Sequence, residues 1–297
     1  MSRTIDEVVS LLWPDLPVEA EPLAGGITNT NYRVEVGGER FVVRLIGART
    51  ELLGIDRTSE MEACRLAADL GIGPELVSAD LGEGVVVTRF IEGRTIAPEE
   101  VGAEPVVAEL ATALGRVHAA GKVASSFDTF RLVPAYRALA GQHGVAPAFD
   151  YETMAGTLER LAAARPWQPS SLCHNDLLNS NLLHDGAVRI VDWEYAGMGD
   201  RFFDLGNLAV NHRFGEAQEE ALLRHYFGRV DEAHLAALRL FELASEAREA
   251  MWGVVQMAIS TLEVDFEAYA GEHAAGFFAL LETIELEESL RLAALVP

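Results

Sequence analysis

Cysteine is scarce in this chain, which has only Cys64 and Cys173 in 297 residues. Neither belongs to a Cys-x-x-Cys pair, and neither stands close to a matching cluster of cysteine and histidine. The sequence therefore argues against a disulfide framework and predicts no zinc site. Both thiols are expected to be buried as small hydrophobic side chains.

Long hydrophobic runs are also missing, since no stretch of about 18 uncharged apolar residues occurs. Met1-Ser2-Arg3 leads into polar Asp6 and Glu7 rather than into the apolar core of a signal peptide. These features predict no stable membrane insertion and a cytoplasmic location.

Basic residues are few: 23 Lys and Arg face 46 Asp and Glu, which gives a formal net charge of −23. Binding to a phosphate backbone needs clustered Lys and Arg, so nucleic acid is not expected as a partner. A cationic substrate suits this balance. A solvated acidic surface that keeps the protein soluble explains the same charge, because net charge speaks to solubility and steering rather than to chemistry.

Several other signatures are absent. We find no internal repeat, no low-complexity tract and no Gly-x-Ser-x-Gly elbow, which argues against a repeat protein and an α/β-hydrolase. Histidines are scattered without metal-ligand spacing, and helix or surface positions are expected for those outside the motif described below. These are His118, His143, His184, His212, His225, His234 and His273.

The first part of the chain has the pattern of a small antiparallel sheet. A short helix is expected over residues 5–13, followed by a strand, a turn and a strand over 23–34. Gly37-Gly38 forms the next hairpin turn and leads into a β-branched run at 40–46. Three successive strands of this kind predict an antiparallel meander.

A helix and two more strands complete this part. Apolar residues recur with helical spacing over 57–70, and the Gly71 to Pro74 segment ends the pattern. Short strands are expected at 76–77 and 85–88, and the chain then becomes mostly helical from about residue 98.

The fold class predicted from this order is α+β with two lobes, and 49% hydrophobic residues suffice for a sizeable core. The change in composition near 93–98 predicts an N-terminal lobe over 1–95 and a C-terminal lobe over 96–297. Helix 105–120 has ordinary core spacing and is expected to be a main packing element of the second lobe.

The segment from His174 to Asn181 carries the strongest chemical signal. It contains Asp176 and, five residues later, Asn181, and a short hairpin then leads to Asp192. Phosphoryl transfer requires one carboxylate that accepts the proton of the attacking hydroxyl, and further oxygen ligands for magnesium. Each of these residues alone would more often form a turn. Their joint spacing and the intervening hairpin favour the functional interpretation.

His174 to Asn181, with Val191 to Tyr195 and Asp204 to Asn207, resembles the choline/ethanolamine kinase family of the aminoglycoside phosphotransferase group. The resemblance implies a protein-kinase-like fold with ATP bound between the lobes. It implies Asp176 as the base, Asn181 and Asp192 as Mg²⁺ ligands, and Glu194 as a further carboxylate near the metal. His174 and Asp204 would brace the loop.

The resemblance extends into the first lobe. Gly25-Gly26-Ile27-Thr28-Asn29 is similar to the phosphate-covering loop of the family, where glycine permits close approach and backbone amides can donate to phosphate. Arg44 occupies the position of the family's phosphate-binding cation, and Glu60 would be its ion-pair partner. The segment Val87 to Gly93 resembles the hinge that offers backbone groups to adenine, with Arg89 to Ile91 as the expected contacts.

The acceptor is suggested by residues 245–270, which resemble the choline-binding helices of choline kinases. Trp252 and Tyr269 match aromatic positions that attract a quaternary ammonium. Choline or ethanolamine is therefore the leading acceptor.

Two further cage positions of the family are Val255 and Val264 here, so the predicted cage is thin. Phe266, Trp193 and Tyr195 are candidates to complete it. A Trp on an amphipathic helix also often belongs to the core.

Three alternatives follow. The acceptor could be thiamine or an aminoglycoside, or the domain could be a catalytically silent nucleotide-binding module, although no member of the catalytic set is missing. Protein kinase activity is disfavoured because no Asp-Phe-Gly and no Ala-Pro-Glu follow the catalytic loop. The sequence does not specify an oligomeric state.

Overall fold

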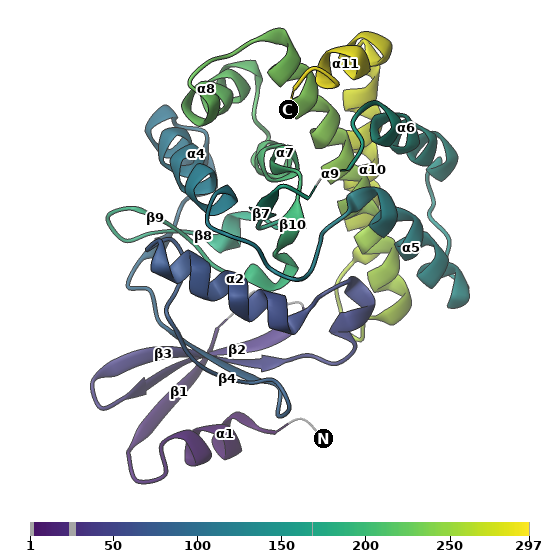
Figure 1. Cartoon of the computed structure of the whole chain (residues 1–297). Coiled ribbons are helices and arrows are strands. Elements are labelled where there is room, and N and C mark those ends of the chain that lie inside the picture. Colours follow the sequence, from purple (N-terminus) through teal and green to yellow (C-terminus); the bar gives the residue numbers. More distant parts are fainter. Residues whose placement is uncertain (1–2, 24–27, 168, 297) are drawn as a thin grey trace.

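The computed structural model describes residues 3–23, 28–167 and 169–296. Its N-terminal part is a five-stranded antiparallel sheet with the strand order β1-β2-β3-β5-β4. Helix α2 lies between this sheet and the rest of the chain, and α1 packs at the far side (Figure 1). The elements are α1 (Ile5–Leu12), β1 (Val18–Leu23), β2 (Asn29–Val36), β3 (Glu39–Ile46), the short helix η1 (Thr50–Leu53), α2 (Arg57–Asp69), β4 (Leu76–Asp80) and β5 (Val85–Arg89).

The central strand β3 divides its side chains between two surroundings because alternate residues of a strand point to opposite faces. Phe41 and Val43 belong to a small core that also contains Val8 and Val9 of α1. Val42 and Arg44, which alternate with them, face the other way, into a cavity on the side of α2. Strand period alone thus places a cation over the cleft.

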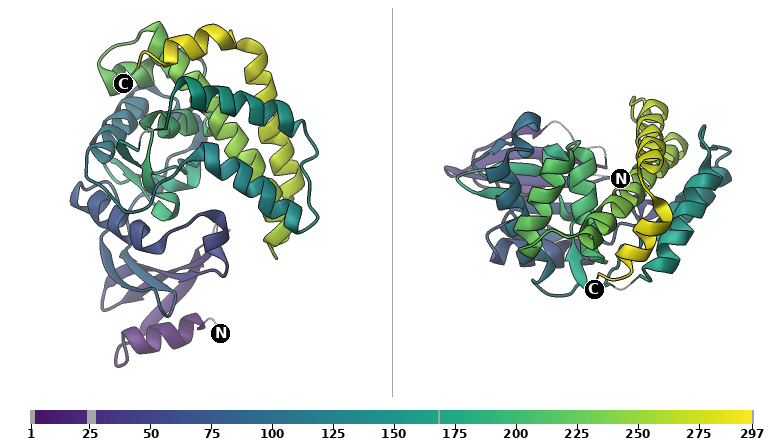
Figure 2. Two further views of the ribbon diagram at one scale, coloured as in Figure 1. Left: turned by 45° about the vertical axis from the view of Figure 1, so that its right-hand side comes forward. Right: turned by 90° about the horizontal axis from the view of Figure 1, so that it is seen from above.

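The C-terminal part is mainly helical and packs around the long helix α9 (Figure 2). Most of α9 is buried from Ala236 to Gln256, which explains why its sequence is apolar on nearly every face. The helices are α3 (Pro98–Val101), α4 (Glu104–His118), α5 (Thr129–Gln142), α6 (Tyr151–Ala164), α7 (Arg201–Asn211), α8 (Glu216–Phe227), α9 (Glu232–Ile259), α10 (Phe266–Thr283) and α11 (Leu286–Ala293).

Short strands support the loop that carries the chemical motif. The hairpin of β8 and β9 is joined by β6 in a three-stranded sheet, and β7 pairs with β10. Two short 3-10 helices lie among these strands. The elements are β6 (Arg94–Thr95), β7 (Ser171–Cys173), η2 (Asn179–Asn181), β8 (Leu182–His184), β9 (Val188–Ile190), η3 (Trp193–Tyr195) and β10 (Gly197–Gly199).

The predicted α+β class, the antiparallel meander, the helix at 57–70, the helix at 105–120 and the hairpin after Asn181 are confirmed. The pairing of β7 with β10 was not expected, and β1 begins at Val18 rather than near residue 23. Residues 25–27 of the predicted phosphate loop lie outside the described residues. The lobe limits of 1–95 and 96–297 stay a prediction.

Two expectations about burial and hydropathy can be compared with the structure. Cys64 and Cys173 are both free and buried, as predicted. Across the part of the chain that the structure describes, no helix combines the length and apolar character needed to span a bilayer.

Candidate functional site

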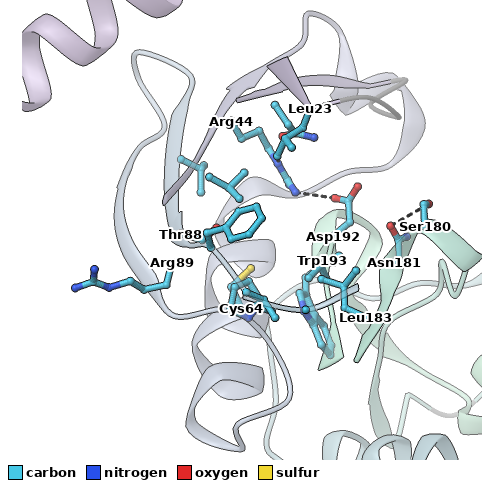
Figure 3. Close-up of a pocket in the computed structure, with 18 of the residues that line it drawn as sticks. Leu23, Arg44, Cys64, Thr88, Arg89, Ser180, Asn181, Leu183, Asp192 and Trp193 are labelled. Atoms are coloured by element: carbon cyan, nitrogen blue, oxygen red, sulfur yellow. Dashed lines mark hydrogen bonds and ion pairs between the residues drawn. The ribbon is translucent and has the colours of Figure 1, made fainter. Parts of the chain in front are cut away.

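A cavity of about 320 Å³ lies between the five-stranded sheet and the β8–β9 hairpin (Figure 3). Its walls come from both parts of the chain, which places it in the cleft. Among the residues that line it are Leu23, Asn31, Val42, Arg44, Glu60, Val86, Thr88, Arg89, Ile91, Asn181, Leu183 and Asp192. The apolar side chains suit the binding of a flat ring, and the polar side chains lie at one end of the cavity around Arg44 and Asp192.

Arg44 bridges two carboxylates in this cavity. Its Nη1 lies 2.6 Å from Glu60 Oε1, and its Nη2 lies 2.9 Å from Asp192 Oδ1 (Figure 3). Burial disfavours the charged guanidinium, but the neighbouring carboxylates, with Asp192 first, outweigh it and raise the pKa of Arg44. The predicted ion pair with Glu60 is confirmed.

The predicted hinge lines the same cavity. Arg89 and Ile91 are both in its wall, but the Arg89 side chain projects away from it (Figure 3). The Arg89 guanidinium lies 2.7 Å from Glu39 and 4.8 Å from the centre of the Phe41 ring. Only the backbone of Arg89 is therefore placed to contact a ligand.

A second cavity of about 90 Å³ adjoins the first and shares Ser180, Asn181 and Asp192 with it. It reaches into the C-terminal part between the catalytic motif and helices α9 and α10. Its lining consists of Thr28, Asp176, Leu178, Ser180, Asn181, Asp192, Glu194, Tyr195, Arg248, Glu249, Trp252 and Tyr269. The motif residues thus stand where the two cavities meet.

Asp204 of α7 holds the loop that carries Asp176. Its carboxylate accepts hydrogen bonds from the backbone N–H of His174 at 2.8 Å and of Asn175 at 2.7 Å. His118 Nε2 lies 3.0 Å from the same carboxylate. Asn175 has a φ of 67°, in the left-handed region that Asn tolerates better than most residues. Asp204 thus stabilises an unusual backbone turn immediately before Asp176.

The rest of the Asp204 to Asn207 motif serves the same loop. Asn207 Oδ1 accepts a hydrogen bond from Leu177 N at 2.6 Å, and its amide donates to Ser245 of α9 at 3.0 Å. Between them, Gly206 lets α7 approach α9 closely. A Cβ at Gly206 would lie 2.7 Å from the backbone carbon of Phe241. Asn207 thus connects the catalytic loop to α9 by hydrogen bonds. The close crossing of α7 and α9 that brings it there requires glycine at position 206.

Asp176 itself is buried in the wall of the second cavity. Its Oδ1 lies 3.4 Å from Arg248 Nη1, and its Oδ2 lies 3.5 Å from Asn181 Nδ2. Burial raises the pKa of Asp176, whereas the Arg248 charge acts in the opposite direction. The carboxylate can accept a proton from a hydroxyl in the cavity.

Asn181 and Asp192 offer oxygen atoms on the boundary between the cavities. Asn181 Nδ2 donates to the backbone oxygen of Asp176 at 2.9 Å, and its amide oxygen, which accepts only a long hydrogen bond from Ser180 Oγ at 3.4 Å, can bind a metal. Asp192 has a φ of 65°, so its side chain leaves the chain just after β9 in an unusual direction. Amide and carboxylate oxygens are the donors that Mg²⁺ prefers, so these two residues fit such an ion.

Glu194 has partners in the N-terminal part of the chain. Its Oε1 accepts from Thr28 Oγ1 at 2.5 Å, and its Oε2 accepts from Asn29 Nδ2 at 2.8 Å. Arg57 Nη1 of α2 lies 3.3 Å from the same Oε2. These contacts link both lobes, and the expected place of Glu194 beside a metal stays a prediction.

Three rings surround the far side of the second cavity. Trp252 and Tyr269 lie with their ring centres 5.4 Å apart at 63°, and Trp252 Nε1 donates to Tyr195 Oη at 2.9 Å. Gly253 makes this arrangement possible, because a Cβ there would lie 2.9 Å from Ala270 Cβ and 3.0 Å from Tyr269 Cδ1. Tyr195 therefore completes the predicted pair of rings.

The other cage candidates point elsewhere. Val255 is fully buried in the core, whereas Val264 is 46% exposed. Phe266 packs behind Trp252 with ring centres 5.9 Å apart, and Trp193 lines the first cavity instead. The second cavity is lined by the rings of Trp252, Tyr269 and Tyr195 and by the ion pair of Arg248 and Glu249, and the aromatic cage for a cation stays a prediction.

The expectation that no histidine forms a cluster is wrong at one place. His118, Cys173 and Asp204 are buried with their potential ligand atoms within 4.8 Å of one another. Asp204 is already engaged by three hydrogen bonds. Burial also raises the pKa of the Cys173 thiol well above its usual range, which keeps it protonated. The cluster is therefore part of the loop support.

Three charged residues of the site were not predicted: Arg57, Arg248 and Glu249. Arg248 and Glu249 form a close ion pair inside the buried stretch of α9. No local signal distinguishes this pair, because the same stretch of α9 also carries Arg239, Glu242 and Glu246. Arg57 carries no signal either, since it opens a helix with an exposed face.

Comparisons with known proteins agree with this geometry. The sequence model of the phosphotransferase enzyme family (APH) matches residues 19–241. Ethanolamine kinase 1 of Mus musculus is 28% identical over 321 residues, covering 90% of this chain and 87% of that protein.

Solved structures extend the likeness to the fold. A choline/ethanolamine kinase family protein from Mesorhizobium loti has a TM-score of 0.79 and 32% identity, covering 94% of this chain and 93% of that one. Choline kinase LicA from Streptococcus pneumoniae has a TM-score of 0.77 and 25% identity, covering 93% and 97%. A structure of LicA in complex with AMP has a TM-score of 0.75, with 25% identity and coverages of 92% and 96%.

The matched residues include the whole sheet, the catalytic loop and the start of α9, and the neighbours share the two-lobed, protein-kinase-like fold. The chain therefore belongs to the phosphotransferase enzyme family and is a small-molecule kinase.

Proposed function

We propose that the chain transfers the γ-phosphate of ATP to the hydroxyl of a small cationic alcohol, with choline and ethanolamine as the leading acceptors. The observation that carries the proposal is the meeting of two cavities at Asn181 and Asp192, with Asp176 just inside the second. Phosphoryl transfer requires donor and acceptor to approach from opposite sides of such a point.

The first cavity suits the nucleotide. Backbone groups from Arg89 to Ile91 lie beside apolar walls that can hold adenine, and Arg44 stands at the opposite end. A planar guanidinium can donate two hydrogen bonds to phosphate oxygens. For this it must leave Asp192, so nucleotide binding would replace the Arg44–Asp192 ion pair.

Asn181 and Asp192 are the residues that would hold Mg²⁺. The ion would neutralise charge on the phosphates and on the transferred group. Asn181 is suited to this because its amide nitrogen is anchored on the Asp176 backbone, which orients its oxygen.

The second cavity suits a cation with a short arm that carries a hydroxyl. The rings of Trp252 and Tyr269 can attract an ammonium group, and Glu249, which also pairs with Arg248, adds a buried carboxylate beside them. Tyr195 lines the same cavity, with the Arg248 guanidinium over its ring. Asp176 lies at the other end of the cavity. An acceptor whose cation sits among the rings would present its hydroxyl to Asp176.

In the proposed step Asp176 accepts the proton of the acceptor hydroxyl while the oxygen attacks the γ-phosphorus in line. ADP leaves on the opposite side. Most of the acceleration would come from positioning and charge neutralisation, because the chain forms no covalent intermediate in this scheme.

The direct test is ADP release with Mg²⁺ and ATP in the presence of choline, ethanolamine, thiamine and several aminoglycosides, with Asp176→Asn as the blank. We expect choline or ethanolamine to raise the rate above the blank. Stimulation by thiamine or an aminoglycoside alone would keep the reaction class and overturn the acceptor. Nucleotide binding without stimulation by any compound would favour a silent module.

A further inference from the structure

A buried cation stands directly behind the proposed base. Arg248 is 1% exposed, and its Nη1 lies 3.4 Å from Asp176 Oδ1. It belongs to α9, 72 residues away in sequence. A buried charge is costly unless it is paired, so this arginine needs a reason to be there.

Glu249 holds Arg248 from the other side. The carboxylate contacts Arg248 Nη1 and is itself anchored, since its Oε2 accepts from Tyr269 Oη at 2.8 Å and its Oε1 lies 3.4 Å from Asn207 Nδ2. Tyr269 comes from α10 and Asn207 from α7. The guanidinium is thus fixed to three helices before it meets Asp176.

Aromatic contacts fix the plane of the same side chain. The Arg248 Cζ lies 4.6 Å from the centre of the Tyr195 ring and 5.7 Å from that of Phe127. Its Nε and Nη2 have no hydrogen-bond partner among the residues that the structure describes. Of its nitrogens, only Nη1 is engaged, and it is shared between Glu249 and Asp176.

Asp176 has few other tethers. Its two side-chain contacts are both long, with Arg248 Nη1 at 3.4 Å and Asn181 Nδ2 at 3.5 Å, but only the contact with Arg248 joins opposite charges. Without Arg248 the carboxylate could turn about its side-chain bonds. A displacement of about 1 Å from a productive geometry can cost about 100-fold in rate.

We propose that Arg248 is a positioning residue for the reaction: it holds Oδ1 of Asp176 so that Oδ2 faces the acceptor hydroxyl. This inference rests on the proposed function of Asp176.

The test compares Arg248→Met, Arg248→Lys and the double variant Arg248→Met/Glu249→Gln with the wild type. We expect kcat to fall about 10- to 100-fold in Arg248→Met while KM for ATP stays within about twofold, because Arg248 is not in the wall of the first cavity. Arg248→Lys should restore part of kcat, since lysine keeps the charge but lacks the planar fork.

The double variant separates positioning from charge balance. Arg248→Met alone leaves Glu249 as an unpaired buried charge and can fail to fold, whereas the double variant removes both charges. We expect the folded double variant to keep a low kcat because Asp176 still lacks its tether. A kcat near the wild-type value would overturn the proposal and leave Arg248 as a neutralising partner of Glu249.

Glu246→Gln is the matched control. Glu246 lies two residues before Arg248 on α9 and pairs with His273 of α10 at 2.7 Å, so it contacts neither Asp176 nor Arg248. Its kcat should match the wild type. A fall equal to that of Arg248→Met would show that any charge change between α9 and α10 has this effect, and would refute the specific role.

A crystal structure of the double variant keeps the inference testable if the wild type phosphorylates none of the acceptors. In that case the proposed function fails, whereas the position of Asp176 can still be compared. We expect its carboxylate to be rotated or spread over two conformers. A carboxylate that superposes on the wild type would overturn the positioning role independently of activity.

Discussion

Replacing Asp204 by Asn perturbs the catalytic loop without changing the size of the side chain. The carboxylate of Asp204 is fully buried and accepts from His174 N, Asn175 N and His118 Nε2 at 2.7 to 3.0 Å. An Asn side chain has one oxygen and one NH₂ group. At least one of the three donors would therefore face an amide hydrogen instead of an acceptor.

The cost can be worked from these contacts. Leaving a buried donor unsatisfied costs about 1–3 kcal/mol, and a hydrogen bond to a charged group contributes about 1.5–3 kcal/mol. Losing one bond and weakening the others should lower the free energy of unfolding by about 3–5 kcal/mol. The left-handed turn at Asn175 loses support at the same time. We therefore expect kcat to fall by at least about tenfold in the protein that remains folded.

Urea unfolding followed by circular dichroism measures the first effect, and steady-state kinetics at a temperature where the variant is folded measures the second. Asp231→Asn is the control, because Asp231 caps α9 with an exposed carboxylate. It should lose no more than about 1 kcal/mol. A loss for Asp204→Asn as small as that of the control, with unchanged kcat, would refute the bracing role.

Three further changes probe other parts of the molecule. Burial raises the pKa of Glu242 to about 8. The folded state therefore keeps a proton that the unfolded state releases near pH 4 to 5, and the free energy of unfolding falls as the pH rises from about 5 to about 8. Glu242→Gln should remove this loss, gaining about 2–4 kcal/mol at pH 8 and little at pH 5 in urea unfolding; equal gains at both pH values would contradict the assignment. Gly253→Ala should push Tyr269 outward and raise KM for the acceptor about tenfold with KM for ATP unchanged, and equal changes in both constants would contradict the geometry. Arg44→Lys should weaken ATP about 10-fold in calorimetric titration, because a lysine cannot contact Glu60 and two phosphate oxygens together; unchanged affinity would remove Arg44 from the nucleotide site.

Local patterns predicted most of the fold. The strands around Gly37-Gly38 and the helix over 57–70 show a hydrophobic periodicity that can be read from adjacent residues. The structure has both where they were expected. The three-residue strands β7 and β10 are too short to show a period. Their pairing depends on chain segments 24 residues apart, from Cys173 to Gly197, so no local signal marks it.

The same distinction explains the site. Asp176, Asn181 and Asp192 lie within one loop and hairpin, and their spacing alone predicted that they come together. Arg248 meets Asp176 only because α7 and α9 cross closely at Gly206, which is a property of tertiary packing. Which rings line the second cavity also depends on tertiary packing. Nothing in the spacing of Phe266 or Trp193 shows that both side chains turn away from it.

Asp176 is the proposed base at the point where the two cavities meet. Isothermal titration of ATP with Mg²⁺ and steady-state turnover, measured together on wild type and Asp176→Asn, test this most directly. We predict that turnover falls by at least about 100-fold while the nucleotide dissociation constant stays within about twofold. Turnover within tenfold of the wild type, or a parallel loss of nucleotide binding, would contradict it.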